Sequence, residues 1–224
     1  MDQEGKPTVK QRMTAANAPN TTREALLIFV RHPNVSAFGL AGLGTLIWHF
    51  YLGGWMWLDA VIAAFVIFSW PFMEWRLHIK ILHMKPTTLF GKDFYPKAAA
   101  KHRQHHIEPW RMELTFLIPS VLMAIPIVFV VAYLLFPFPQ ALTVCFVGYL
   151  MTVQYEWTHF ITHTRVQPKS NYYKKVFRNH RLHHFKNERY WYAFGGPWVD
   201  TYCGTGPDPD SVESSKNCQT LGID

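Results

Sequence analysis

Long uncharged stretches alternate with polar segments along the chain. No Asp, Glu, Lys or Arg lies between Arg31 and Asp59, between Asp59 and Glu74, or between Glu113 and Glu156. A water-soluble core mixes charged and apolar positions at helical or strand periods, and these stretches do not. Apolar blocks of roughly 20 residues that end at turn signals are typical of helices that span a membrane.

Four membrane-spanning helices are predicted, at residues 35–52, 56–74, 114–136 and 141–158. The Gly53-Gly54 pair separates the first two, and the sequence FPFPQ separates the last two. The four helices therefore pair into two hairpins, and both hairpins return to the same side of the membrane. The pattern predicts an all-α integral membrane protein with a helical domain at that side.

The polar segments are expected to form shorter helices and the chain ends. Thr21 and Glu24 have capping-box spacing, so residues 22–31 form either an interfacial helix that ends before Pro33 or a loose extension of the first span. KAAAKHRQHH in the loop 76–112 and SNYYKKVFRNHRLHHFKN after the last span favour helix.

Three regions follow from this pattern. Residues 1–35 are a cytoplasmic segment that carries the interfacial helix, and its first 20 residues are expected to be disordered. Residues 36–206 form the membrane domain. Residues 207–224, rich in Ser, Pro and Asp, are expected to be a flexible tail.

The charges are confined to one side of the predicted hairpins. Of the 22 Lys and Arg residues, five precede residue 36, eight lie within 76–111 and nine follow residue 164, whereas the two hairpin turns have none. This distribution places both termini and the central loop in the cytoplasm of a bacterial inner membrane or endoplasmic reticulum protein. The net charge of +7 then faces anionic lipid rather than nucleic acid.

Two further features of the sequence narrow the class of protein. The cysteines number three and form no CxxC pair, which disfavours a disulfide framework or a thiolate zinc site. The first residues, MDQEGKPTVKQR, lack the apolar segment of a cleavable leader, so the first span is expected to direct insertion.

Ten of the twelve histidines fall into four groups. Two groups follow the second and fourth spans as HxxxxH and HxxxH, and the other two are HxxHH boxes in the polar segments. Their members are His78 and His83; His102, His105 and His106; His159 and His163; His180, His183 and His184. Positions i, i+3 and i+4 of a helix share one face, so each box directs three imidazoles the same way.

The four groups are expected to converge on one metal-binding site. Both helix-end groups emerge on the side that carries both boxes, and neutral imidazole is a common metal ligand. His83 is five residues from His78, about 140° around an ideal helix, so the pair either straddles a metal or lies where the helix distorts. Ten ligands exceed the needs of one tetrahedral zinc and favour two metal ions.

Two histidines and two carboxylates of interest lie outside the four groups. His32 and His49 lie outside the groups and are interpreted as interfacial or interhelical residues that tolerate replacement. Glu156 either orients a ligand imidazole or meets a basic group at the helix end. Asp200 either hydrogen-bonds an imidazole or caps a helix.

The chemistry follows from the ligands and their place. Nitrogen ligation suits iron, zinc or copper, and the membrane helices point to an acyl chain or another lipid as substrate. Attack on an unactivated C–H bond needs a redox metal and dioxygen, which favours iron, although zinc can fill a purified protein. A lipid hydroxylase is the leading hypothesis. A desaturase or sterol oxidase is the alternative, and a non-enzymatic metal-binding or transport protein is disfavoured because transporters place polar groups within their spans.

These motifs resemble the fatty acid hydroxylase superfamily, which includes sterol desaturases and methyl oxidases, and most closely the fatty acid 2-hydroxylases. The resemblance covers residues 36–205 and rests on KHRQHH, YEWTHFITHT, NHRLHHFKN and the closing YAFGGPWVDTYCGT, with Asp200, Gly204 and Thr205 in that closing stretch. It implies hydroxylation at C2 of an acyl chain. About 35 residues precede the first span, too few for a fused cytochrome b5 domain, so a separate donor such as cytochrome b5 or ferredoxin with its reductase is expected.

Overall fold

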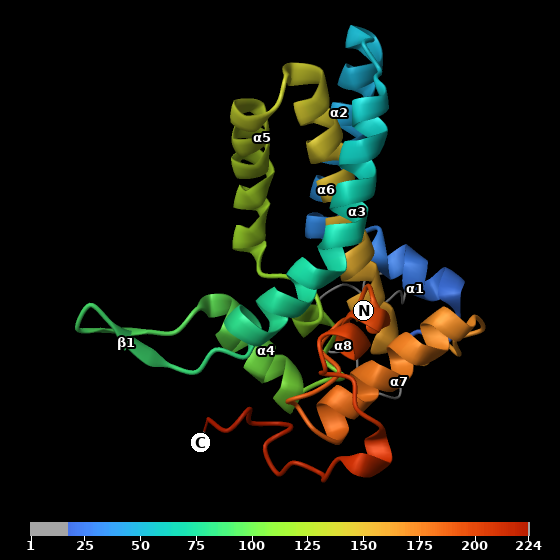
Figure 1. The fold of residues 1–224 in the computed structure, drawn as a ribbon. Coiled ribbons are helices and arrows are strands. Elements are labelled where there is room, and N and C mark those ends of the chain that lie inside the picture. Colours follow the sequence, from blue (N-terminus) through green and yellow to red (C-terminus); the bar gives the residue numbers. More distant parts are fainter. Residues whose placement is uncertain (1–17, 224) are drawn as a thin grey trace, which may run out of the picture.

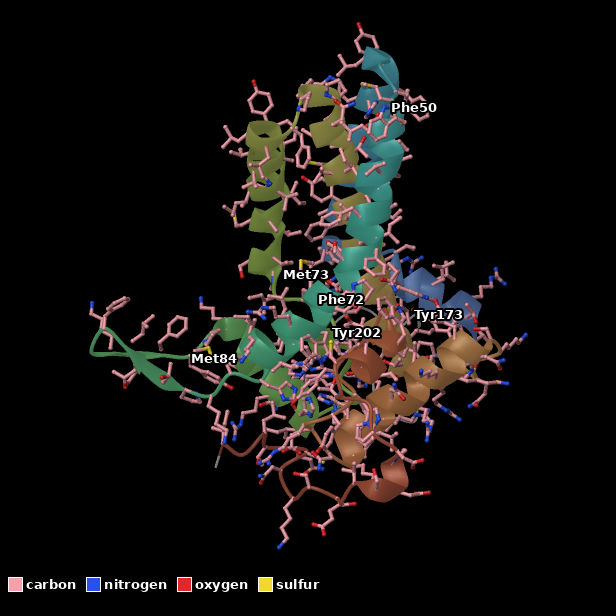
Figure 2. The ribbon with its side chains drawn as sticks, in the orientation of Figure 1. Phe50, Phe72, Met73, Met84, Tyr173 and Tyr202 are labelled. Atoms are coloured by element: carbon pink, nitrogen blue, oxygen red, sulfur yellow. The ribbon has the colours of Figure 1, made fainter. Side chains whose placement is uncertain are left out.

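The computed structural model describes residues 18–223. Upright helices form a bundle, and shorter helices form a second layer at one end of it (Figure 1). Figure 2 shows Phe50 at the far end of the bundle and Tyr173 in the layer at the other end. The expected disorder of residues 1–20 falls largely outside the described residues.

The first hairpin forms much as the sequence predicts. Helix α1 (Thr22–Phe29) is short, and the Thr21 side chain accepts a hydrogen bond from the Glu24 N–H at its start. Helix α2 (Pro33–Leu52) begins with proline, whose missing N–H has no partner to lose in a first turn. Gly53 follows with φ of +67°, a conformation that glycine adopts without strain, and α3 (Trp57–Leu77) returns.

The second hairpin is less regular. Two 3₁₀ turns, η2 (Met112–Leu114) and η3 (Pro119–Met123), precede the short helix α5 (Ala124–Leu135). Helix α6 (Phe138–Thr162) then runs 25 residues back to the second layer. The single helix expected at 114–136 is therefore interrupted at Ile118, whose extended backbone (ψ 147°) is the conformation that a following proline favours, and η3 begins at Pro119.

Within residues 18–223, three segments are long and apolar enough to cross a membrane: Pro33–Leu52, Trp57–Leu82 and Met112–Leu135. The chain is an α-helical membrane protein. Helix α6 is long enough but is not among the three; it packs against α2, α3 and α5 and contains several buried polar side chains, such as Gln140 and Thr143. A count of four spans therefore stays a prediction.

A buried polar network fixes the far end of the bundle. The Asp59 carboxylate accepts hydrogen bonds from Thr143 Oγ1 and, at 3.3 Å, from Gln140 Nε2, both on α6. His49 Nε2 of α2 lies 3.1 Å from Asp59 Oδ1. These contacts join three helices where lipid cannot supply hydrogen bonds.

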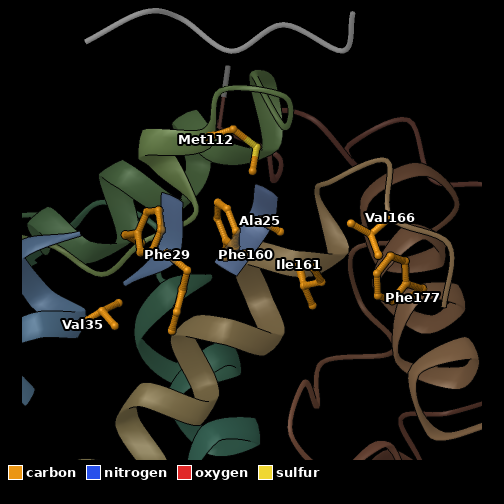
Figure 3. Close-up of a cluster of buried hydrophobic side chains, with 9 residues drawn as sticks. Ala25, Phe29, Val35, Met112, Phe160, Ile161, Val166 and Phe177 are labelled. Carbon is orange, nitrogen blue, oxygen red and sulfur yellow. The ribbon is translucent and has the colours of Figure 1, made fainter. Parts of the chain in front are cut away.

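The second layer contains α4 (Lys97–Ile107), α7 (Asn171–Phe185), α8 (Pro197–Tyr202) and the 3₁₀ turn η4 (Pro209–Ser211). A cluster of buried apolar side chains packs α1, α6 and α7 together, as Figure 3 shows. Its large members include Phe29, Phe116, Phe160 and Phe177. This cluster fixes where α6 meets α7, and both helices carry histidines.

One element departs from the all-α expectation. Strands β1 (Thr87–Leu89) and β2 (Lys92–Phe94) form an antiparallel hairpin that projects sideways from the second layer (Figure 1). Its turn residues Phe90 and Gly91 both have positive φ, as a two-residue hairpin turn of type I′ requires. The strands are only three residues long, too short for alternation to predict them.

Candidate metal centre

Four elements of the chain deliver the ten grouped histidines. His78 and His83 lie at the end of α3, three histidines lie on α4, His159 and His163 lie at the end of α6, and three lie on α7. Nine of the ten side chains are buried, and His83 is partly exposed. The structure thus brings together all ten residues that the sequence singles out.

The pair His78 and His83 is aligned by a change of helix type. Helix α3 continues as a π-helical turn, η1 (His78–Leu82), and the His83 N–H donates to the His78 carbonyl at 3.0 Å. A π turn closes i→i+5 hydrogen bonds, so it brings positions five apart to the same side. The distortion that the i+5 spacing suggested is therefore present.

The imidazoles form two groups of five, within each of which the candidate ligand atoms lie within 4.8 Å of one another. The first group contains His78, His83, His102, His106 and His183. The second group contains His105, His159, His163, His180 and His184. Each group draws two histidines from a bundle helix end, two from one box and one from the other box.

Neighbouring histidines in each box belong to different groups. On α4, His106 joins the first group and His105 the second; on α7, His183 joins the first and His184 the second. The rings of His105 and His106 lie 6.1 Å apart and nearly perpendicular. One helix therefore supplies ligands on both sides of the boundary between the groups.

The nitrogen spacing fits a metal ion. His102 Nε2 lies 3.0 Å from His78 Nε2, 3.2 Å from His83 Nε2 and 3.1 Å from His106 Nε2. In the second group, His159 Nε2 lies 3.1 Å from His105 Nε2. Two nitrogen ligands at right angles, each about 2.1 Å from an ion, are about 3.0 Å apart. Buried lone pairs that face each other at this spacing are costly unless a cation lies among them.

Backbone carbonyls orient three rings of the first group. The Nδ1 atoms of His78, His106 and His183 lie 2.7, 2.8 and 2.7 Å from the carbonyl oxygens of Tyr192, Cys218 and Tyr190. A carbonyl only accepts, so Nδ1 carries the hydrogen and Nε2 presents its lone pair to the group.

The second group is held differently. Among residues 18–223, the buried Nδ1 atoms of His105, His180 and His184 have no hydrogen-bond partner. Packing rather than backbone hydrogen bonds therefore orients these three rings. His163 of the second group does have a backbone hydrogen bond, to Pro109, so the two groups differ in how many of their rings the backbone holds.

Burial keeps the rings on α4 and α7 neutral. Desolvation, with added repulsion from neighbouring histidines, lowers the pKa of His102, His105, His106, His180 and His184 well below 6.5. For His183, burial lowers the pKa to about 4 although the hydrogen bond to Tyr190 opposes the shift. Neutral imidazole is the form that binds a metal.

An aromatic residue that the sequence did not single out lies between the groups. The Phe194 ring centroid is 4.8 Å from those of His78, His159 and His180. It therefore contacts the first group through His78 and the second through the other two. Phe194 is buried, so it excludes water from this side of the histidines.

The two predicted carboxylates contact backbone rather than imidazole. Asp200 accepts hydrogen bonds from the Tyr192 and Ala193 N–H groups at 2.9 and 3.0 Å, and Tyr192 in turn orients His78. Glu156 accepts from the Leu117 N–H at 3.1 Å. Asp200 thus acts on His78 indirectly, through Tyr192. Burial raises the pKa of the Asp200 carboxyl group to about 6.

A third carboxylate was missed. Glu74, buried on α3, accepts a hydrogen bond from the Gly195 N–H at 2.9 Å and from Trp70 Nε1 at 2.6 Å. It ties the stretch around Phe194 to the bundle. A lone acidic residue at the end of an apolar block gave no signal that separated it from an interfacial charge.

The two ungrouped histidines lie away from both groups of five. The His32 ring stacks on Phe116 with centroids 3.7 Å apart. His49 lies at the far end of the bundle, where it contacts Asp59 and stacks on Trp55 at 3.9 Å. Its interhelical contact agrees with the sequence interpretation, but its burial argues against easy replacement.

A family model named fatty acid hydroxylase matches residues 63–205, which include all ten grouped histidines. The chain belongs to the fatty acid hydroxylase family. No curated protein matches its sequence. As a member of this family, the chain is a membrane-bound lipid hydroxylase with a histidine-rich site that could bind metal ions.

A solved structure shares the fold of this hydroxylase family member. It is described as full-length scs7p with only the hydroxylase domain visible, and the TM-score is 0.60. The match covers 91% of this chain and 70% of the other at 20% sequence identity. Identity that low supports the shared fold alone.

Proposed function

We propose that this chain is a di-iron oxygenase that uses dioxygen to hydroxylate a lipid acyl chain, with C2 as the position oxidised. The two groups of five histidines carry the proposal. All ten histidines are assigned as ligands, five to each metal. Two five-nitrogen sets with ring nitrogens about 3 Å apart suit iron, and bound iron would supply the redox chemistry that a C–H bond requires.

The residues around the groups would admit and confine the substrate. A small cavity of about 30 Å³ is lined by His102 of the first group and His159 of the second. Its walls are mostly apolar and include Leu82, Phe116 and Tyr155. A space of this size accepts one chain methylene or one small molecule, which places a C–H bond beside both groups. Phe194 would exclude water from the histidine rings that it contacts.

The membrane arrangement supports the same reaction. We assign α6 as a fourth span and place both termini and the histidines on the cytoplasmic side of a bacterial inner membrane or endoplasmic reticulum membrane, because the basic residues are on that side. Electrons would come from a separate protein such as cytochrome b5, or ferredoxin with its reductase.

Lipid analysis of membranes with and without the protein tests the proposal. Growth under ¹⁸O₂ should give an acyl chain that gains one heavy oxygen atom, and fragmentation should place the hydroxyl at C2. Loss of two hydrogens would instead identify a desaturase. The test requires protein that holds two metals and receives electrons. If such protein neither adds oxygen to the lipid nor removes hydrogen from it, an oxidative function is contradicted.

A further inference from the structure

The last described residues of the chain, 207–223, lie beyond the family match, which ends at residue 205. We call them the C-terminal strap. Their composition favours a flexible tail, but the structure gives them many hydrogen bonds. The Ser215 N–H donates to the Lys186 carbonyl at 2.7 Å, and Asn187 Nδ2 donates to the Glu213 carbonyl at 3.1 Å. The strap is thereby joined to the end of α7, just after His183 and His184.

The strap is also joined to α4 and to the chain beside His83. Arg103 donates to the carbonyls of Thr220, at 3.1 Å, and Ile223. Lys85 Nζ donates to the Gly222 carbonyl at 2.9 Å. The acceptors are all backbone carbonyls, so side-chain composition gave no sign of these contacts. The strap therefore contacts each of the three elements that supply His83, His106 and His183 to the first group.

The strap places one atom against a histidine of the first group. Cys218 is 6% exposed, and its carbonyl lies 2.8 Å from His106 Nδ1. Leu221 is also buried and holds the strap down. Because the carbonyl fixes the Nδ1–H tautomer, it directs the Nε2 lone pair of His106 toward His102 and the rest of the first group.

The second group has no equivalent contact with the strap in residues 18–223. Its box residue His184 is buried with neither ring nitrogen hydrogen-bonded. The two boxes also differ at the arginine that follows their first histidine. Arg103 contacts the strap, whereas Arg181, at the same place in the second box, is exposed on α7. The chain thus supplies a matched pair of arginines for a test.

We propose that the C-terminal strap positions His106 and selectively retains the metal of the first group. This inference rests on the proposed function only in assuming that each group binds a metal. Among the described residues, the strap acts through the His106 ring and makes no hydrogen bond to a second-group histidine, so loosening it should affect one metal of the two. Loss of an outer hydrogen-bond partner typically weakens metal affinity about 10–100-fold.

The first experiment measures metal per chain in purified Arg103→Gln and Arg181→Gln proteins after a timed challenge with a chelator. Arg103→Gln should fall from two metals toward one, and Arg181→Gln should match the unaltered protein. His180→Ala, which removes a second-group ligand, identifies the metal lost. Arg103→Gln in that background should retain close to none, and Arg181→Gln close to one.

A cut strap gives an independent test in protein that is already folded. A protease site placed between the exposed residues Glu213 and Ser214 would be cleaved after metal loading, and the circular dichroism of the helices would confirm that the fold survives. Faster loss of one metal after cleavage supports the proposal. Equal loss of both metals, or unchanged retention in both tests, overturns it. Protein that retains two metals but does not oxidise lipid would contradict the proposed function. It would not contradict the proposed role of the strap in retaining the first metal.

Discussion

The His83 N–H donates to the His78 carbonyl at 3.0 Å, and the π turn that this i→i+5 hydrogen bond ends lets two residues at one helix end face the same group. The contact places His83 Nε2 3.2 Å from His183 Nε2, although 100 residues separate them. A regular α-helix would direct the two rings about 140° apart. The π turn therefore brings His83 into the first group as its fifth histidine.

Adjacent histidines on α7 should affect different metals. His183→Ala removes a ligand of the first group, and His184→Ala removes one of the second, so each variant should lose about one metal per chain and its turnover. The double variant should lose both metals. Elemental analysis, with product formation normalised to protein level, measures this. A single substitution that releases both metals while the helices stay folded would contradict the assignment to separate groups.

Replacement of His49 should destabilise the bundle without touching the metals. His49→Ala leaves the buried Asp59 carboxylate without one of its partners, and such a loss costs about 1–3 kcal/mol. Thermal unfolding in detergent should show a lower midpoint, and metal analysis should still find two ions. A changed metal content with an unchanged unfolding midpoint would contradict the assignment of His49 to the stability of the bundle.

Gly196 should not accept a side chain. A Cβ atom there would lie 2.6 Å from Pro71 Cβ, so Gly196→Ala must displace the stretch that carries Phe194 from α3. Overpacking of this kind costs about 1–3 kcal/mol. Gly148→Ala is the control, because its Cβ meets nothing within 4 Å, and alanine favours helix over glycine by about 1 kcal/mol. Unfolding midpoints that move in the same direction for both variants would contradict the packing.

The two ends of the bundle should label from opposite sides of the membrane. Trp55→Cys and Ser214→Cys would each be made with Cys203→Ser, since Cys145 and Cys218 are buried. A membrane-impermeant maleimide applied to intact cells or sealed vesicles should reach only one of the two positions, with residue 214 on the cytoplasmic side. Labelling of both from the same side would exclude four spans.

Sequence patterns located the histidines but not their division. The spacing of each HxxHH box and the shared side of the helix ends were enough to gather ten residues. The assignment of His105 and His106 to different groups depends on the approach of α7, which no local pattern records. Their role as ligands stays a prediction.

The parts that were missed are contacts made by backbone or by packing. The carbonyls of Tyr190, Tyr192 and Cys218 orient three rings, and a carbonyl is present at every position of a chain. In the sequence, nothing distinguishes Phe194 from other aromatic residues near a membrane, because its contacts with the histidines depend on the fold. The tail from residue 207 was expected to be flexible because its side chains are polar, yet its main-chain acceptors hold it.

The division of the ligands has a further consequence. In each HxxHH box the first and third histidines join the group supplied by the preceding helix end, and the middle one, His105 or His183, joins the other group. Two identical chains, each with one hairpin and one box, would build the same pair of groups across a two-fold axis by exchanging their middle histidines. This single chain therefore has the ligand pattern of a symmetric dimer, and neither of its halves contains a complete set of five.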